Sequence, residues 1–140
     1  MQKNDLSTDE NLKLSVLLLK SIPMAKRHNY KNLSIWKLGL EIAFNVSDII
    51  KKFPEIERFA LSDQMNRCSI SIPSNIAEGS ARSQKSFKYY VNIAMGSSFE
   101  LVTQLLIAKH RAYITEAEFE MIEAKIEHFQ RMASGFQNQL

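Results

Sequence analysis

The sequence predicts an all-α protein, an antiparallel up-down four-helix bundle with a proline-kinked second helix and a short N-terminal extension helix. Apolar residues recur every three or four positions through four long segments, and short turn signals separate those segments. No alternating strand pattern competes with this periodicity. The chain has 140 residues, of which 45% are hydrophobic and 24% charged, as expected for one soluble domain. We expect an extension over residues 1–29 and a bundle domain over residues 30–140.

The extension contains a candidate helix from Thr8 to Ile22, with capping-box spacing at Ser7 and Glu10 and a stop at Pro23. Its leucines surround most of the circumference, so the helix should bury itself against another surface. We expect packing on its own bundle or on a neighbouring subunit. A membrane-surface or partner-binding arm and a disordered segment are the alternatives. Residues 26–30 are expected to form a solvated basic linker.

The first bundle helix is predicted from Leu33 to Phe53, where Pro54 ends it, and it carries a broad apolar stripe. The second runs from Leu61 to Glu78. Its core face is expected to hold Leu61, Met65, Cys68, Ile72 and Ile76. Pro73 inside this helix predicts a kink, and Gly79 is expected to stop the helix in the left-handed conformation.

The third helix is predicted from Gln84 to Tyr113, with Ser83 as its N-cap. Small residues in its middle, Gly96 and Ser97 among them, predict close packing against another helix, as Gly79 does. The fourth helix should begin after Thr115, which forms a capping box with Glu118.

A specific set of residues resembles a known family. Arg67, the run SIPSNIAEG over residues 71–79, Phe87, and then Gly96, Ser97 and Glu100 follow the pattern of the bacterial 23S rRNA intervening-sequence proteins. The resemblance covers residues 30–140. It implies a four-helix protomer, ring-shaped pentamers, and kinship with an accessory protein of diversity-generating retroelements that binds nucleic acid and a reverse transcriptase. It brings no catalytic residue.

A polar stripe on the second helix predicts an interhelix network. Arg67 and Glu78 lie three helical turns apart, so they share a face. We expect Arg67 to pair with Glu100 or Glu78 in a partly buried network that fixes helix register or a subunit interface. A ligand or partner site and a catalytic site are the alternatives. The candidate members are Arg67, Ser71, Asn75, Glu78 and Glu100.

Basic residues of the third helix are the candidate nucleic-acid contacts. They are Arg82, Lys85, Lys88, Lys109 and Arg111. Solvated surface is the competing interpretation, and Lys109 and Arg111 also complement a helix C-terminus. The net charge of +3 comes mostly from the N-terminal extension, so the body of the chain is nearly neutral.

The residue pattern favours a binding or structural role over catalysis. No Glu-x-x-His pair, zinc-site spacing, phosphate-binding glycine loop or catalytic triad occurs, so we expect no metal, cofactor, catalytic residue or small-molecule substrate. The single cysteine, Cys68, predicts a buried thiol in a cytoplasmic protein, and the longest apolar run, Val16 to Leu19, is too short to span a membrane. Two functions remain open. The first is an oligomer that binds structured RNA or a nucleoprotein partner, and the second is a scaffold whose assembly is its function.

Overall fold

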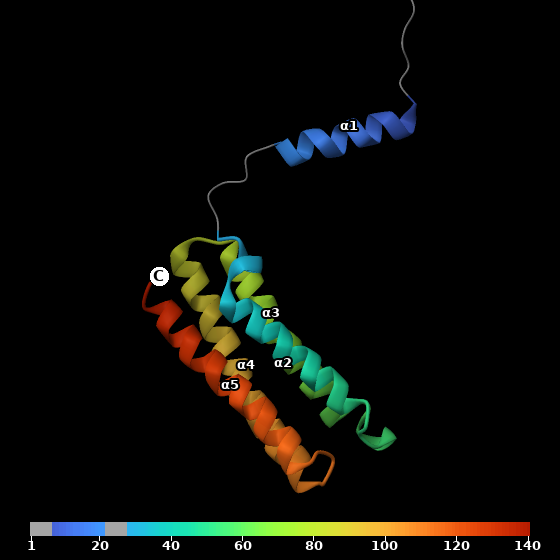
Figure 1. The fold of residues 1–140 in the computed structure, drawn as a ribbon, viewed down its shortest axis with the longest axis vertical. Coiled ribbons are helices and arrows are strands. Elements are labelled where there is room, and N and C mark those ends of the chain that lie inside the picture. Colours follow the sequence, from blue (N-terminus) through green and yellow to red (C-terminus); the bar gives the residue numbers. More distant parts are fainter. Residues whose placement is uncertain (1–6, 22–27) are drawn as a thin grey trace, which may run out of the picture.

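A computed structural model describes residues 7–21 and 28–140, and within these ranges the chain forms helices and turns without a strand. The helices are α1 (Thr8–Ser21), α2 (Ser34–Ile50), α3 (Leu61–Ser80), α4 (Gln84–His110) and α5 (Glu116–Gln137), with short 3₁₀ turns at Tyr30–Asn32 and Glu55–Glu57. Helices α2 to α5 lie side by side, and successive helices run in opposite directions (Figure 1). The predicted all-α class is therefore confirmed.

Hydrogen bonds at the caps define where α4 and α5 begin. The Ser83 hydroxyl accepts from the Ser86 backbone N–H at 3.3 Å, and the Thr115 hydroxyl accepts from the Glu118 N–H at 3.1 Å. The Glu118 carboxylate in turn accepts from the Thr115 N–H at 3.2 Å, which completes the predicted capping box. At its other end α4 stops at His110, earlier than predicted, because Ala112 adopts the left-handed conformation with φ of 58°.

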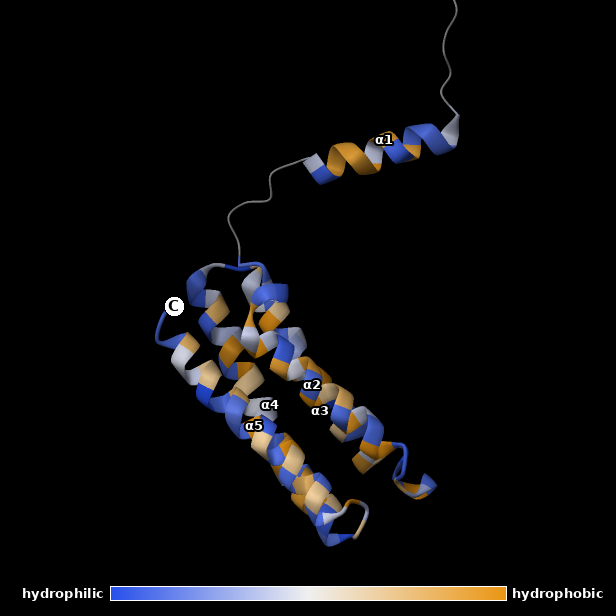
Figure 2. Cartoon of the chain, viewed as in Figure 1, coloured by the Kyte–Doolittle hydropathy of each residue, from blue (hydrophilic) through white to orange (hydrophobic). Residues whose placement is uncertain are grey.

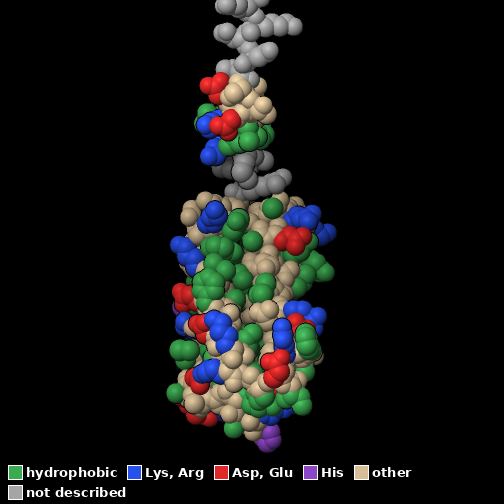
Figure 3. All heavy atoms as spheres, turned by 90° about the vertical axis from the view of Figure 1, so that its right-hand side faces the viewer, with side chains coloured by type: hydrophobic (Ala, Val, Ile, Leu, Met, Phe, Trp, Pro, Cys, Tyr) green, Lys and Arg blue, Asp and Glu red, His purple; other side chains and the backbone are tan. Residues whose placement is uncertain are grey.

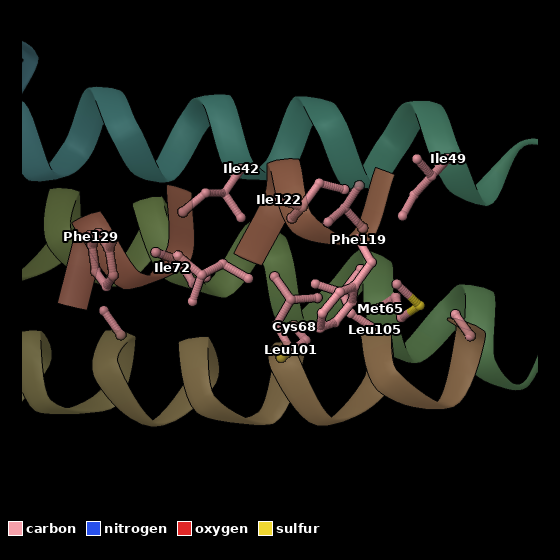
Figure 4. Packing of buried hydrophobic residues seen from close by; sticks show 14 of the residues in the cluster. Ile42, Ile49, Met65, Cys68, Ile72, Leu101, Leu105, Phe119, Ile122 and Phe129 are labelled. Atoms are coloured by element: carbon pink, nitrogen blue, oxygen red, sulfur yellow. The ribbon is translucent and has the colours of Figure 1, made fainter. Parts of the chain in front are cut away.

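The core lies between the four bundle helices. Side chains from all of them point toward one another in Figure 4, including Ile42 of α2, Ile72 of α3, Leu101 of α4 and Ile122 of α5. Each of these four is fully buried. The predicted core face of α3 is correct throughout, since Leu61, Met65, Cys68, Ile72 and Ile76 are all buried. Periodic burial of large apolar side chains supplies most of the stabilisation of such helices.

Helix α3 continues through Pro73 to Ser80. The side-chain amide of Asn75 donates to the Ser71 carbonyl at 2.7 Å, near the break that the proline makes in the backbone ladder. Helix α2 approaches α3 at this proline, since a Cβ added to Gly39 of α2 would lie 3.3 Å from the Pro73 nitrogen. The two backbones are thus close at this point. The kink itself stays a prediction.

Two expectations about glycines require correction. Gly79 does not stop α3 in the left-handed conformation, because α3 includes it and no glycine among the described residues has positive φ. Its small size serves packing instead: an added Cβ would lie 2.6 Å from Phe87 Cδ2 and 2.7 Å from Tyr90 Cβ. Gly96 is exposed with no atom within 4 Å of its added Cβ, so the predicted close packing there is wrong. The neighbouring Ser97 faces α3.

The N-terminal helix forms as predicted but stands apart from the bundle (Figure 1). No residue of α1 is buried, and it has no packing contact with the other described elements. Of the two expected packing partners, its own bundle is therefore wrong, and a neighbouring subunit stays a prediction. Within the predicted solvated linker, His28 packs against Phe87 and Tyr30 against Trp36, so that part is not simply solvated. Residues 22–27 lie outside the described ranges.

Helix α4 also bears on the question of a membrane. By length and composition it is the one described helix that could cross a bilayer, although the sequence analysis predicted none. Its most apolar stretch is 39% buried inside the bundle. Core helices of soluble proteins share this length and composition, so α4 alone is weak evidence for a membrane span.

The difference between Gly79 and Gly96 can be tested with two alanine substitutions. Gly79→Ala forces a methyl group against Tyr90 Cβ, which is fixed to the α4 backbone, and should destabilise the protein by about 1–3 kcal/mol. Gly96→Ala meets open space in a helix interior and should stabilise by up to about 1 kcal/mol. Urea unfolding of both variants measures the two free energies. Equal effects of the two substitutions would contradict the close approach at Gly79.

Candidate functional site

A small polar seam joins α3 to α4. The Ser71 and Ser97 hydroxyls lie 2.8 Å apart, and the Asn75 side-chain amide donates to the Ser71 hydroxyl at 3.0 Å. The Cys68 thiol donates to the Ser97 carbonyl at 3.1 Å. Half-buried polar groups need such partners, because an unpaired one costs about 1–3 kcal/mol. Two predicted network members, Ser71 and Asn75, are therefore joined, together with the predicted close-packing residue Ser97.

The charged members of the predicted network take other partners. Arg67 pairs with Asp63 on its own helix at 3.3 Å, and its side chain is largely exposed. Its predicted ion pair with Glu100 or Glu78 is wrong in this structure, because an acid one turn away is already within reach. Glu78 accepts from Arg82 and from the Tyr90 hydroxyl, both at 3.0 Å. The charges thus remain near the surface.

A polar hollow lies beside the seam. It is lined by Gln64, Arg67, Cys68, Ser71, Ser97 and Glu100. Burial, and secondly the nearby Glu100 carboxylate, raise the pKa of the Cys68 thiol to about 12. The thiol therefore stays protonated at neutral pH and is a poor nucleophile. In the described ranges, no group of three metal-ligating side chains comes together.

The five candidate nucleic-acid contacts fall into two groups at opposite ends of α4. Its 27 residues span about 40 Å, so the groups cannot form one patch. At the C-terminal end, Arg111 pairs with Glu57 at 2.8 Å. Lys109 pairs with Glu116 at 3.2 Å and lies 4.2 Å from the centre of the Phe119 ring. Both cations are therefore engaged in contacts within the chain.

The N-terminal end of α4 offers a more available positive surface. Lys85 and Lys88 are exposed, and neither is in an ion pair with any described residue, while Arg82 pairs with Glu78. The antiparallel arrangement brings the start of α2 to the same end of the bundle, with exposed Lys31 and Lys37. We call Lys31, Lys37, Arg82, Lys85 and Lys88 the basic end.

Sequence reasoning missed Lys31 and Lys37 because they lie about fifty positions before Lys85. The signal was present in the predicted topology. In an up-down bundle the start of the first helix and the start of the third lie at the same end. Counting charges by bundle end, and not by helix, would have joined them.

A buried carboxylate, Glu57, organises the opposite end of the bundle. It accepts from the Tyr113 hydroxyl at 2.9 Å, from Arg111 at 2.8 Å and from the Leu61 backbone N–H at 3.2 Å. The Tyr113 bond, followed by the Leu61 bond, lowers the pKa of Glu57, and the carboxylate raises that of Tyr113. Glu57 thus caps α3, which has no side-chain N-cap of its own, and ties it to the turn after α4.

Comparisons with known proteins agree with this architecture. Residues 31–135 match the sequence pattern of the family described as 23S rRNA-intervening sequence protein. A crystal structure from Bacteroides thetaiotaomicron VPI-5482, of a protein of unknown function from the S23 ribosomal protein family, is similar with a TM-score of 0.68 and 25% identity. The similarity covers 74% of this chain and 97% of that chain. No curated protein sequence matches this chain.

The Glu57 cluster predicts a pH dependence of stability. Since folding lowers the pKa of Glu57 below its usual 4.5, its contribution is complete above pH 4.5 and is lost as the pH falls through the folded-state pKa. Glu57→Gln should unfold more easily than wild type at neutral pH, and the difference should shrink on acidification. Urea unfolding at a series of pH values measures this. A difference that stays constant down to pH 3 would contradict the role of the carboxylate charge.

Proposed function

We propose that this chain, which belongs to the 23S rRNA-intervening sequence protein family, is a non-enzymatic cytoplasmic module that assembles with copies of itself and binds structured RNA through its basic end. The observation that carries the proposal is the group of exposed lysines at one end of the bundle, of which Lys85 and Lys88 are free of ion pairs with described residues. Neither the family name nor the neighbour's description names an enzymatic activity.

Lysine and arginine side chains bind nucleic acid by releasing counterions from the phosphate backbone. Such contacts carry affinity but little sequence information, so the basic end would recognise the shape and charge of a folded RNA. The family name points to ribosomal RNA, and the neighbour is assigned to a ribosomal protein family, which makes RNA the preferred class of nucleic acid. A nucleoprotein would present the same phosphates.

Five basic residues per copy make a weak site. Assembly would strengthen it, because several copies acting on one RNA turn later contacts into intramolecular ones. The pentamer that the family resemblance implies would supply five basic ends. The proposal thus joins self-association and RNA binding in one mechanism.

A scaffold without RNA binding is the second candidate. It is favoured by the exposed apolar side chains of the bundle, including Phe44 and Phe99, which are 61% and 58% exposed. Large exposed apolar surfaces mark interaction sites more often than free surface. In that case assembly itself is the function, and the lysines only keep the oligomer soluble.

The charge-reversed variant Lys85→Glu/Lys88→Glu tests RNA binding. With a fluorescein-labelled stem-loop RNA, we expect affinity at low salt to fall at least about tenfold, and the slope of log affinity against log salt to fall by about one to two. Fluorescence anisotropy measures both quantities, and light scattering shows whether assembly is unchanged.

The matched control is Lys51→Glu/Arg58→Glu, which makes the same change in net charge at the opposite end of the bundle. It should bind RNA more tightly than the Lys85→Glu/Lys88→Glu variant. Equal loss in both variants would mean that only net charge matters. No binding by the wild type, with assembly intact, would favour the scaffold.

A further inference from the structure

Helix α1 exposes an apolar surface that no described residue covers. Among its side chains Leu12, Leu17, Leu18 and Leu19 are each more than 60% exposed. Leu12, Val16 and Leu19 recur at helical spacing and form one stripe, and Figure 2 shows that much of α1 is hydrophobic. A helix of this composition gains stability only by packing on another apolar surface.

The bundle carries a second uncovered apolar surface, a groove between α2 and α3. Its lining includes Trp36, Leu40 and Phe44 of α2 and Ile70 and Ala77 of α3. Phe44 is 61% exposed and Ile70 is 48% exposed. Figure 3 views the bundle from the right-hand side of Figure 1 and shows hydrophobic side chains gathered there. We call this surface the α2–α3 groove.

The two surfaces match in length. Helix α1 has 14 residues and is about 21 Å long. The α2–α3 groove follows α2 from Trp36 to Ser47, about 16 Å. The whole helix is therefore long enough to cover the groove, and its Leu12–Leu19 stripe makes up two turns, about 10 Å, of that length.

Helix α1 does not occupy its own groove, because none of its residues is buried and it has no packing contact with the bundle. Tyr30 packs on Trp36 at the groove, with ring centres 5.1 Å apart. Two residues earlier, His28 packs on Phe87 of α4 and Phe136 of α5, at 5.5 and 6.1 Å. At His28 the described chain thus lies on the α4–α5 side, while the groove lies between α2 and α3.

We propose that α1 of one copy docks, through its Leu12–Val16–Leu19 stripe, in the α2–α3 groove of a second copy. Each copy then gives an arm and receives one. The inference rests on the self-association in the proposed function and not on RNA binding. Since the arm lies outside the segment that matches the family, residues 31–135, the contact belongs to this chain's own extension.

Disulfide cross-linking between two co-expressed full-length chains tests the docking. Both chains carry Cys68→Ala; one also carries Val16→Cys and the other Ile70→Cys with a size tag. Both sites are exposed in the single chain, so folding should be unaffected. Mild oxidation should join up to about half of each chain into a mixed dimer on a non-reducing gel, because in a random mixture an arm meets the groove of the other chain about half of the time. In the control, Phe99→Cys on α4 replaces Ile70→Cys and should give at least about fivefold less product.

A second variant separates docking from chance collision. Leu12→Asp should reduce the Val16–Ile70 cross-link at least about fivefold, because a buried carboxylate opposes docking. Equal cross-linking at Ile70 and Phe99 would overturn the proposal. A third chain, with Val16→Cys and Ile70→Cys together, would also overturn it if this chain cross-linked within itself while the two separate chains did not cross-link to each other. So would the absence of any cross-link together with α1-dependent binding to phosphatidylglycerol vesicles. The cross-linking yield does not depend on RNA binding. A failure of the RNA-binding test would therefore leave this result unaffected.

Discussion

The close approach of α3 to both of its neighbours is the constraint on which the bundle depends. Helix α3 packs more extensively than any other element, against α4 on one side and α2 on the other. Gly79 permits the first contact, where an added Cβ would meet Phe87 and Tyr90, and Gly39 permits the second at Pro73. Polar groups trapped in the narrow α3–α4 contact must satisfy one another, which accounts for the Ser71–Ser97 pair and the Asn75 bond. Register and polar pairing are therefore two consequences of the same short separation.

Periodicity predicted the helices because burial of an apolar face is what stabilises them, so each predicted core residue of α3 is buried. Positions decided by contacts between helices were harder. Nothing in the residues around Gly39 predicts its close contact with α3. Gly96 was predicted to pack closely because composition does not show which side of a helix meets a neighbour. Arg67 followed the same pattern: the sequence showed that it shares a face with Glu78, but not that Asp63 is within reach first. The end of α4 depends on the left-handed Ala112, which no residue preference indicated.

The two ends of the bundle use their charges differently. At the Glu57 end, Arg111 and the Tyr113 hydroxyl both donate hydrogen bonds to one buried carboxylate. The same carboxylate also caps α3. A cation in such a cluster is unavailable to a partner without exposing the acid it neutralises. At the basic end no buried acid pairs with Lys85 or Lys88, while Lys31 comes from the 3₁₀ turn before α2 and Lys37 from α2 itself. The body of the chain is nearly neutral, yet among the described residues of the bundle the antiparallel topology leaves lysines without an ion pair at one end only.

Assembly and RNA binding draw on different forces, which is why one chain can combine them. The α2–α3 groove and the Leu12–Val16–Leu19 stripe of α1 are apolar, so their association should depend little on salt, whereas contacts of lysines with phosphate weaken steeply as salt rises. A single copy with a net charge of +3 is a weak partner for a polyanion. When an exchanged arm links copies, the number of basic ends presented to one RNA increases without any new charge on the chain. The effective concentration of the second basic end is then set by the oligomer's geometry, and this makes the apolar arm a determinant of affinity for an RNA that it does not touch.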